Sequence, residues 1–317
     1  GVYYNLDESL PKDLPSVIAN TKLKEDYNMN TTHMILVDSS VAGSDVKKMS
    51  QEIEKVDGVK WVLGLDNLVG SGVPADMLPE SVTGMLKNDK YQLLMVNSTY
   101  KVATDKVNKQ IEQIDKIMDK YDKGAMLVGE GPLTKDLINI TDTDFKRVSA
   151  VSIGIVFVII LLLFKSVTIP VILVGVIEFA IFVNMGIPFY TGTKLPFVAS
   201  IVIGTIQLGA TVDYAILMTT RYQRERSRGA GKFDAITTAH KFSAQSIIVS
   251  ALSFFAATIG VGLYSNIDMI SSLCILMARG ALISMVVVVL ILPSLFMVFD
   301  KIIVKTSKGF QPSGLKS

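Results

Sequence analysis

The sequence predicts a membrane protein in which an extracytoplasmic α/β domain precedes a bundle of five transmembrane helices. Half of the 317 residues are apolar, and the long apolar runs all follow Lys146. Residues 1–145 contain 16 basic and 23 acidic side chains, whereas residues 146–317 contain 15 basic and six acidic ones. Apolar runs and charge therefore divide the chain into two predicted domains, 1–145 and 146–317.

Residues 1–145 carry the pattern strand, helix, strand twice. The expected strands are 33–40, 59–65, 91–99 and 125–130, and the expected helices are 45–56 and 105–121. In the second helix an apolar stripe at spacings of three and four suits a helix that covers a sheet. The stripe consists of Val107, Ile111, Ile114 and Met118. Two such units predict an α/β sandwich of the split βαβ kind.

Between the two units, residues 70–88 form a segment punctuated by glycine and proline, which predicts a loop with a short helix. Its apolar side chains are Met77, Leu78, Met85 and Leu86. They fit either a surface that contacts an apolar substrate or the core of the domain.

Five apolar runs follow, at 148–164, 167–187, 197–219, 246–264 and 273–299. Crossing a hydrocarbon core of about 30 Å takes roughly 20 helical residues. The runs therefore predict five transmembrane helices, and the alternative of a large soluble helical core would not need such long uninterrupted runs.

Basic residues predict the orientation, because loops rich in lysine and arginine stay in the cytoplasm. Arginines and lysines gather in the segment 220–245 and in the tail after Phe299. Both are placed on the cytoplasmic side of the membrane, which puts residues 1–145 on the outer, extracytoplasmic side. The first residues are neither apolar nor signal-like, so we expect that a signal peptide or a further transmembrane helix precedes them.

Enzyme signatures are scarce. His33 and His240 fall on opposite sides of the predicted membrane and cannot share a metal or a catalytic triad. The stretch VGEGP, residues 128–132, lacks the Lys-Ser/Thr pair that holds phosphate and magnesium. We therefore expect no enzymatic activity, cofactor, metal or nucleic-acid partner, and energy supplied by an ion gradient or a partner protein.

Of the six acids after residue 145, only Glu178 and Asp213 lie inside apolar runs. A charge at mid-membrane costs at least about 2.5–3.5 kcal/mol, so such residues usually serve a function. Arg279 is the candidate cation for a structural pair. At 1.5 Å per residue, Arg279 lies within about 10 Å in depth of Glu178 and nearly twice as far from Asp213. Depth therefore favours an intramembrane Glu178–Arg279 ion pair and leaves Asp213 as the group that gains and loses protons.

The neighbours of Asp213 suggest close helix packing. Thr205, Gly209, Asp213 and Leu217 follow one another at intervals of four, and small residues on such a face let another helix approach closely. Tyr214 adds a hydroxyl that fits two interpretations, a hydrogen-bonding or proton-passing group and a bulky side chain facing lipid.

The stretch GATVDYAILMTTRYQRER, residues 209–226, resembles the Asp-Tyr motif helix of MMPL-type transporters in the RND superfamily. The likeness continues through VGEGPLTKDL, LLLFKSVTIPVIL and LMARGALISMVVVVLILPSLF. Such transporters have two similar halves, each with one helix, a porter domain and five further helices. This sequence resembles a C-terminal half without its leading helix.

The resemblance implies proton-driven export of lipids, lipid conjugates or other amphiphiles, with Asp213 and Tyr214 in the proton relay. It also implies that the second Asp-Tyr pair comes from the other half of the transporter or from further copies of the chain. A sterol-sensing-like receptor, a scaffold or an accessory membrane protein would share the five helices without needing Asp213 to titrate.

The orientation is testable by cysteine labelling from outside the cell. We expect a cysteine placed in residues 70–73 to react with an impermeant reagent, and one placed at 229–231 to be spared. The reverse labelling pattern would overturn the predicted topology.

Overall fold

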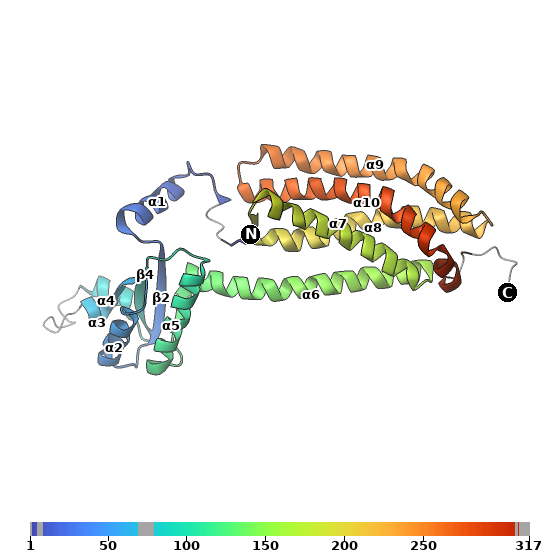
Figure 1. Cartoon of the computed structure of the whole chain (residues 1–317). Coiled ribbons are helices and arrows are strands. Elements are labelled where there is room, and N and C mark those ends of the chain that lie inside the picture. The colour runs from blue at the N-terminus through green and yellow to red at the C-terminus, as the bar shows by residue number, and fades with distance from the viewer. Residues whose placement is uncertain (1, 5–8, 69–78, 308–309, 311–317) are drawn as a thin grey trace. The chain divides into compact units, whose positions relative to one another are not determined.

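The computed structural model describes residues 2–4, 9–68, 79–307 and 310. These residues form two compact units, one of residues 4–141 and one of residues 142–317 together with the short strand β1 (Val2–Tyr3) (Figure 1). The division falls inside one long helix, α6 (Glu130–Phe164), a few residues before the boundary expected from charge.

The first unit is built on a four-stranded antiparallel sheet in the order β3-β4-β2-β5. Its strands are β2 (Thr31–Asp38), β3 (Val59–Leu63), β4 (Tyr91–Ser98) and β5 (Met126–Gly129). Because β4 is antiparallel to both of its neighbours, β2 and β3 run parallel with β4 between them. Helix α2 (Gly43–Ile53) connects these two strands, which makes a split βαβ unit. The strands β4 and β5, connected by α5 (Asp105–Tyr121), form a second such unit around β2.

Amphipathic patterning explains how these helices cover the sheet. Burial alternates along β2, whose Ile35 and Val37 are fully buried. Thr104 caps the N-terminus of helix α5, and its Oγ1 accepts a hydrogen bond from the backbone N of Val107 at 3.3 Å. The predicted stripe of Val107, Ile111, Ile114 and Met118 is confirmed as buried, and Val46, Met49 and Ile53 of α2 pack into the same region.

Three short helices complete this unit: α1 (Pro15–Tyr27), α3 (Leu65–Leu68) and α4 (Glu80–Leu86). Met77 and Leu78 lie outside the described residues, as do positions 70–73. Of the other two apolar side chains expected near here, Leu86 is 6% exposed and belongs to the core, whereas Met85 is 76% exposed.

The second unit contains the five helices of the described chain that are long and apolar enough to cross a membrane. They are α6, α7 (Thr168–Thr191), α8 (Phe197–Ser227), α9 (Lys232–Tyr264) and α10 (Asp268–Thr306). A two-residue strand, β6 (Leu195–Pro196), pairs with β1 in parallel. Most of the basic segment 220–245 is helical, because α8 and α9 extend past their apolar runs and leave only a short turn between them. Gly229 supplies the positive φ of +90° in that turn.

Helix α10 holds this bundle together by packing against α7, α8 and α9. The largest fully buried side chain is Tyr222 of α8, whose ring stacks on Phe296 of α10 with centroids 5.0 Å apart. Val288 and Leu292 extend the same core along α10.

A buried histidine in the first unit has no charged partner among the described residues. His33 of β2 is fully buried, and its Nε2 lies 3.3 Å from Oε1 of Gln110. The Nε2 of Gln110 donates to the backbone oxygen of Asp57 at 2.8 Å, while His33 Nδ1 is buried without a hydrogen-bond partner among the described residues. Burial lowers the pKa of His33 below its usual value of 6.5, because protonation would add an unpaired donor and a charge to the interior.

We expect the first unit to lose stability in acid. Below about pH 6.5 the unfolded chain takes up a proton at this residue before the folded chain does, so the free energy of unfolding falls. Replacing His33→Gln should remove most of this dependence. Hydrogen exchange of the β2 and β4 amides over a pH series, corrected for intrinsic exchange rates, measures it.

His240→Gln, on α9 in the other unit, is the matched control and should leave the pH dependence of β2 and β4 unchanged. Identical pH profiles for the wild type and His33→Gln would contradict the assignment.

Candidate functional site

Asp213 lies in the middle of α8 on a face that is not covered by the rest of its unit. Gly209, Asp213 and Leu217 are all exposed, whereas Tyr214, the next residue along, is buried. Successive residues on a helix point about 100° apart. The two residues of the Asp-Tyr motif therefore face different surroundings, one outward and one into the bundle.

The Asp213 carboxylate borders a hollow of about 390 Å³ between α8 and α9. Ser246 and Ser250 of α9, one helical turn apart, line it together with Tyr214 and Phe254. Within the described part of the chain, Asp213 makes no hydrogen bond or ion pair. The hydroxyl-bearing hollow leaves room for water or for a side chain from outside this unit.

A second, much narrower cavity lies on the bundle side of Tyr214. Gln207 and Thr211 of α8 and Ser284 of α10 line it. Tyr214 borders this cavity as well as the hollow at Asp213. The phenol therefore stands between the carboxylate and a set of buried polar side chains.

These polar side chains form a connected hydrogen-bond network. Gln207 Nε2 donates to Ser284 Oγ at 3.0 Å, and Thr211 Oγ1 donates to the same oxygen at 2.9 Å. On the other side of Gln207, Asn184 Nδ2 of α7 donates to Gln207 Oε1 at 2.8 Å. The network thus joins α7, α8 and α10 in the interior of the bundle.

Arg279 ends this network. Its Nε donates to Asn184 Oδ1 at 2.8 Å, and its Nη2 donates to the Asn184 backbone oxygen at 2.9 Å. Gly280 makes this packing possible, because a Cβ there would lie 2.7 Å from both Asn184 Nδ2 and Gln207 Oε1.

The structure does not bring Glu178 and Arg279 together, which corrects the pair expected from depth. No hydrogen bond or ion pair joins them among the described residues, and Arg279 bonds to Asn184 instead. The physical reason is depth itself: Asn184 lies six residues beyond Glu178 on α7, about 9 Å further along the axis and close to the level of Arg279. The sequence signal for this partner of Arg279 was an uncharged amide, Asn184, inside an apolar run.

Glu178 borders a separate hollow of about 290 Å³ between α6, α7 and α8. Ser149 and Ser152 of α6 and Phe182 of α7 line it with Glu178. Glu178 has no hydrogen-bond or ion-pair partner among the residues that the structure describes. It is therefore a second acid inside a predicted span that this unit leaves unpaired.

The described residues do not supply the close helix packing expected at Gly209, and Thr205 is half-buried. A Cβ added at Gly209 would meet nothing within 4 Å. The Thr205 hydroxyl donates to the Ile201 backbone oxygen of its own helix at 3.0 Å. Gly209 thus lies on the open face that carries Asp213.

A buried ion pair at the other end of α8 was not predicted. Arg226 Nε and Nη2 donate to the two carboxylate oxygens of Asp300 at 3.0 and 3.1 Å, and the Tyr222 hydroxyl donates to the same carboxylate. The Asp300 side chain is 8% exposed. Asp300 directly follows the last apolar run, and Arg226 was assigned to a cytoplasmic segment, so neither stood out as a buried charge.

Among the described residues, no group of three or more His, Cys, Asp or Glu side chains is placed to hold a metal ion. The polar atoms of the bundle are instead arranged as carboxylates, hydroxyls and amides. Such groups can bind and pass protons or position water.

Solved structures share this architecture. Two crystal forms of a heavy metal efflux pump match the chain with TM-scores of 0.51 and 0.53, at 12% and 11% identity. Each match covers 86% of this chain, and about a third of the pump chain, 35% and 36%. At this identity the likeness shows the fold alone. The five helices and this fold indicate a multi-pass membrane protein with the fold of that pump.

The MMPL family model matches residues 9–311, and the chain belongs to the MMPL family. Its relatives include the membrane protein YdgH of Bacillus subtilis (strain 168), 24% identical, with 79% of this chain and 28% of the relative covered. The "Probable transport protein MmpL1" of Mycobacterium tuberculosis (strain CDC 1551 / Oshkosh) is 23% identical, with 80% and 27% covered. The "Probable transport protein MmpL4" of Mycobacterium leprae (strain TN) is 22% identical, with 91% and 31% covered. The chain thus spans less than a third of the length of these relatives.

The observed contacts of Arg279 lead to a double-mutant test. A Glu178–Arg279 pair would make Glu178→Gln partly restore the stability lost in Arg279→Ala. The structure predicts instead that these two changes add, while Asn184→Ala and Arg279→Ala are non-additive because both remove the hydrogen bond between Arg279 Nε and Asn184 Oδ1. Thermal unfolding of the purified single and double variants measures both cycles. Rescue by Glu178→Gln would show that the two residues do interact.

Proposed function

We propose that the chain is part of a proton-motive-force-driven exporter of lipids or other amphiphilic molecules in the bacterial plasma membrane. Membership of the MMPL family and the transport descriptions of its relatives support a role in transport. One observation carries the proton-driven part: a carboxylate in the middle of a membrane helix, Asp213, is exposed beside a hydroxyl-lined hollow and has no partner among the described residues.

The free-energy cost of exposing the Asp213 carboxylate to hydrocarbon implies that another part of the transporter covers it. An ionised side chain facing hydrocarbon costs at least about 2.5–3.5 kcal/mol on insertion scales, and more on an isolated helix. Gly209, next to it on the same face, leaves open space that a second helix can enter. We propose that the covering helix belongs to the other half of the transporter or to a second copy of this chain.

Protonation then controls how this face packs. The neutral acid can lie against an apolar or hydrogen-bonding helix, whereas the ionised acid favours water in the 390 Å³ hollow beside it. A proton entering from the acidic outer side and leaving inside would switch α8 between these two states. This switch couples the proton gradient to movement of the helices.

Tyr214 is the proposed intermediary. Its phenol lines both the hollow at Asp213 and the cavity bordered by Gln207, Thr211 and Ser284. A hydroxyl can donate and accept at once, so this position suits the transfer or orientation of a proton. The hydrogen-bond network from Thr211 to Arg279 fixes the helices around it, and in the predicted orientation it extends toward the outer side.

The sheet domain is proposed to act on the substrate. In the predicted topology residues 1–145 lie outside the membrane, where an exported amphiphile must be received. The energy for its work would come from the helices, since no site for nucleotide hydrolysis was identified in the sequence.

We expect Asp213→Asn to abolish export while the protein still folds and reaches the membrane. Asparagine keeps the size and hydrogen bonding of aspartate but cannot cycle a proton. Tyr214→Phe should weaken export less, because it removes one hydroxyl and no charge. Proton-coupled export of a fluorescent amphiphile from vesicles that contain the assembled transporter measures the effect.

Asp234→Asn, an acid in the first turn of α9 outside the apolar run, is the matched control and should export at the wild-type rate. Export by Asp213→Asn at the wild-type rate under a proton gradient would contradict the relay. That result would favour a sterol-sensing-like receptor, a scaffold or an accessory role.

A further inference from the structure

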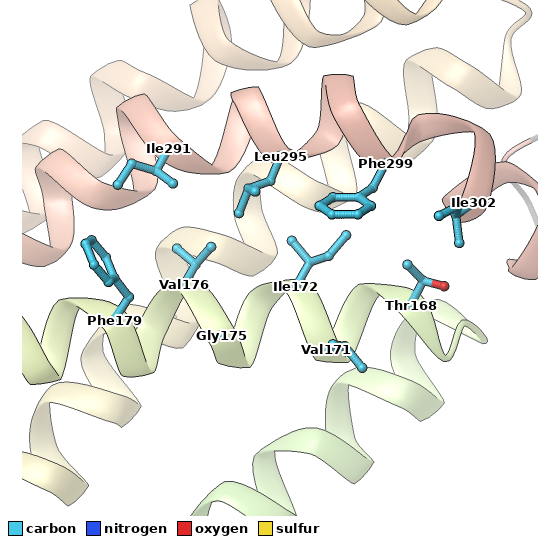
Figure 2. Close-up of a pocket in the computed structure, with 10 residues that line it drawn as sticks. All are labelled: Thr168, Val171, Ile172, Gly175, Val176, Phe179, Ile291, Leu295, Phe299 and Ile302. Carbon is cyan, nitrogen blue, oxygen red and sulfur yellow. The ribbon is translucent and has the colours of Figure 1, made fainter.

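A groove of about 490 Å³ runs between α7 and α10, away from Asp213. Figure 2 shows the side chains of the two helices facing each other across it, with Thr168 and Ile302 at one end and Phe179 and Ile291 at the other. Its volume is in the range of small-molecule sites. Apart from the Thr168 hydroxyl, the lining side chains are hydrocarbon.

The length of the groove matches one leaflet of a membrane. Thr168 and Phe179 are eleven residues apart on α7, and Ile302 and Ile291 are eleven apart on α10. At 1.5 Å per residue each wall is about 16 Å long, roughly half of a 30 Å hydrocarbon core. The walls stay accessible, because Val171, Phe179 and Ile302 are each about half exposed.

Hydroxyl groups close one end of the groove. Thr168 Oγ1 and Thr306 Oγ1 are 2.7 Å apart, and Ser307 Oγ donates to Ser166 Oγ at 2.5 Å. These contacts join the start of α7 to the end of α10. They also fix the backbone position of Lys165 and Lys305, which directly precede Ser166 and Thr306.

Two lysines lie beside this closed end. Lys165 directly precedes Ser166. Lys305 directly precedes Thr306 and lies three residues after Ile302, which lines the groove. Both side chains are exposed, and neither has an ion-pair partner in the described part of the chain. In the predicted orientation they stand at the cytoplasmic surface, where phospholipid phosphates lie.

We propose that an anionic phospholipid occupies this groove, with one acyl chain along the α7–α10 walls and its phosphate beside Lys165 and Lys305. An apolar channel of one leaflet's depth, with hydroxyl groups and two exposed lysines at one end, matches the acyl chain, the polar backbone and the phosphate of such a lipid in order. A helix face that merely contacts bulk lipid needs neither the concavity nor the cations. The inference does not depend on proton coupling at Asp213.

Gly175 offers a way to fill the groove without disturbing the protein. It lies in the α7 wall, and a Cβ there would meet nothing within 4 Å. Leucine at this position should occupy the space of the acyl chain while improving helix propensity. Gly186, eleven residues further along the same helix, has equally open surroundings outside the groove and gives the matched control, Gly186→Leu.

The test uses the full protein in phosphatidylcholine nanodiscs that contain a small fraction of photoreactive phosphatidylglycerol, with a diazirine at the end of one acyl chain. Mass spectrometry of the labelled peptides should place the adducts near Phe179 and Ile291, at the deep end of the groove. Gly175→Leu should lose these adducts and Gly186→Leu should keep them. Excess unlabelled phosphatidylglycerol should compete with the probe in the wild type.

The charge variants test the headgroup. Lys165 has a positive φ of 48°, a conformation that asparagine tolerates, so Lys165→Asn removes the charge without straining the turn. Lys165→Asn and Lys305→Gln should each lower labelling about fivefold, the effect of one basic residue near an anionic surface. Lys241→Gln on α9 is the control and should change nothing.

Three results would overturn the proposal. Equal labelling of Gly175→Leu and the wild type would place the acyl chain elsewhere. Equal labelling by a phosphatidylcholine probe would remove the role of the anionic headgroup, and so would unchanged labelling of both lysine variants. Size-exclusion profiles and circular dichroism of each variant, matched to the wild type, exclude misfolding as the cause of a loss.

Discussion

The absence of hydrogen-bonding solvent in the hydrocarbon core is the constraint on which this structure depends. A polar group there must be satisfied inside the protein. Asn184, Gln207 and Ser284, each on a different helix, satisfy one another and thereby fix how α7, α8 and α10 meet. The apolar surfaces alone would leave that register loosely defined, since lipid tails are as apolar as the helices.

Against this background the two unpaired acids are the informative exceptions. Asp213 and Glu178 each border a hollow instead of a partner in the described chain, one between α8 and α9 and the other beside α6. An acid without a partner inside a membrane span is expected at a functional site, or where a further chain supplies the partner. The open face around Gly209 has room for a helix of such a further chain, which would supply the partner that Asp213 lacks in the described chain.

Much of the fold could be predicted because it follows from pattern. The apolar runs mark the five helices, and the strand-helix-strand pattern with its stripe on α5 matches the observed sheet and cover. The ends of the helices could not be predicted from hydropathy, because α8 and α9 continue as helices through basic residues that pack along the bundle surface.

The site was predicted less completely. The position of Asp213 in a helix follows from its sequence, but the direction it faces depends on which helices surround α8. Charge alone predicted that Arg279 pairs with Glu178, whereas its partner in the structure is the amide of Asn184, which lies at the same depth as Arg279. The contact between Arg226 and Asp300 joins residues far apart in sequence at the edges of two apolar runs, so no local pattern indicates it.

The ties between α8 and α10 have a mechanical consequence. Gln207 bonds to α10 about a third of the way along α8, and Arg226 bonds to Asp300 of α10 near the C-terminal end of α8. These two anchor points are 19 residues apart, about 28 Å along the helix and close to the full hydrocarbon thickness. Axial sliding of α8 along α10 would break both sets of hydrogen bonds, so these contacts oppose such sliding. Helix α7 is tied to α10 in the same way, through Asn184 and Arg279 and through Thr168 and Thr306, so only displacements of α6 and α9 leave these bonds intact.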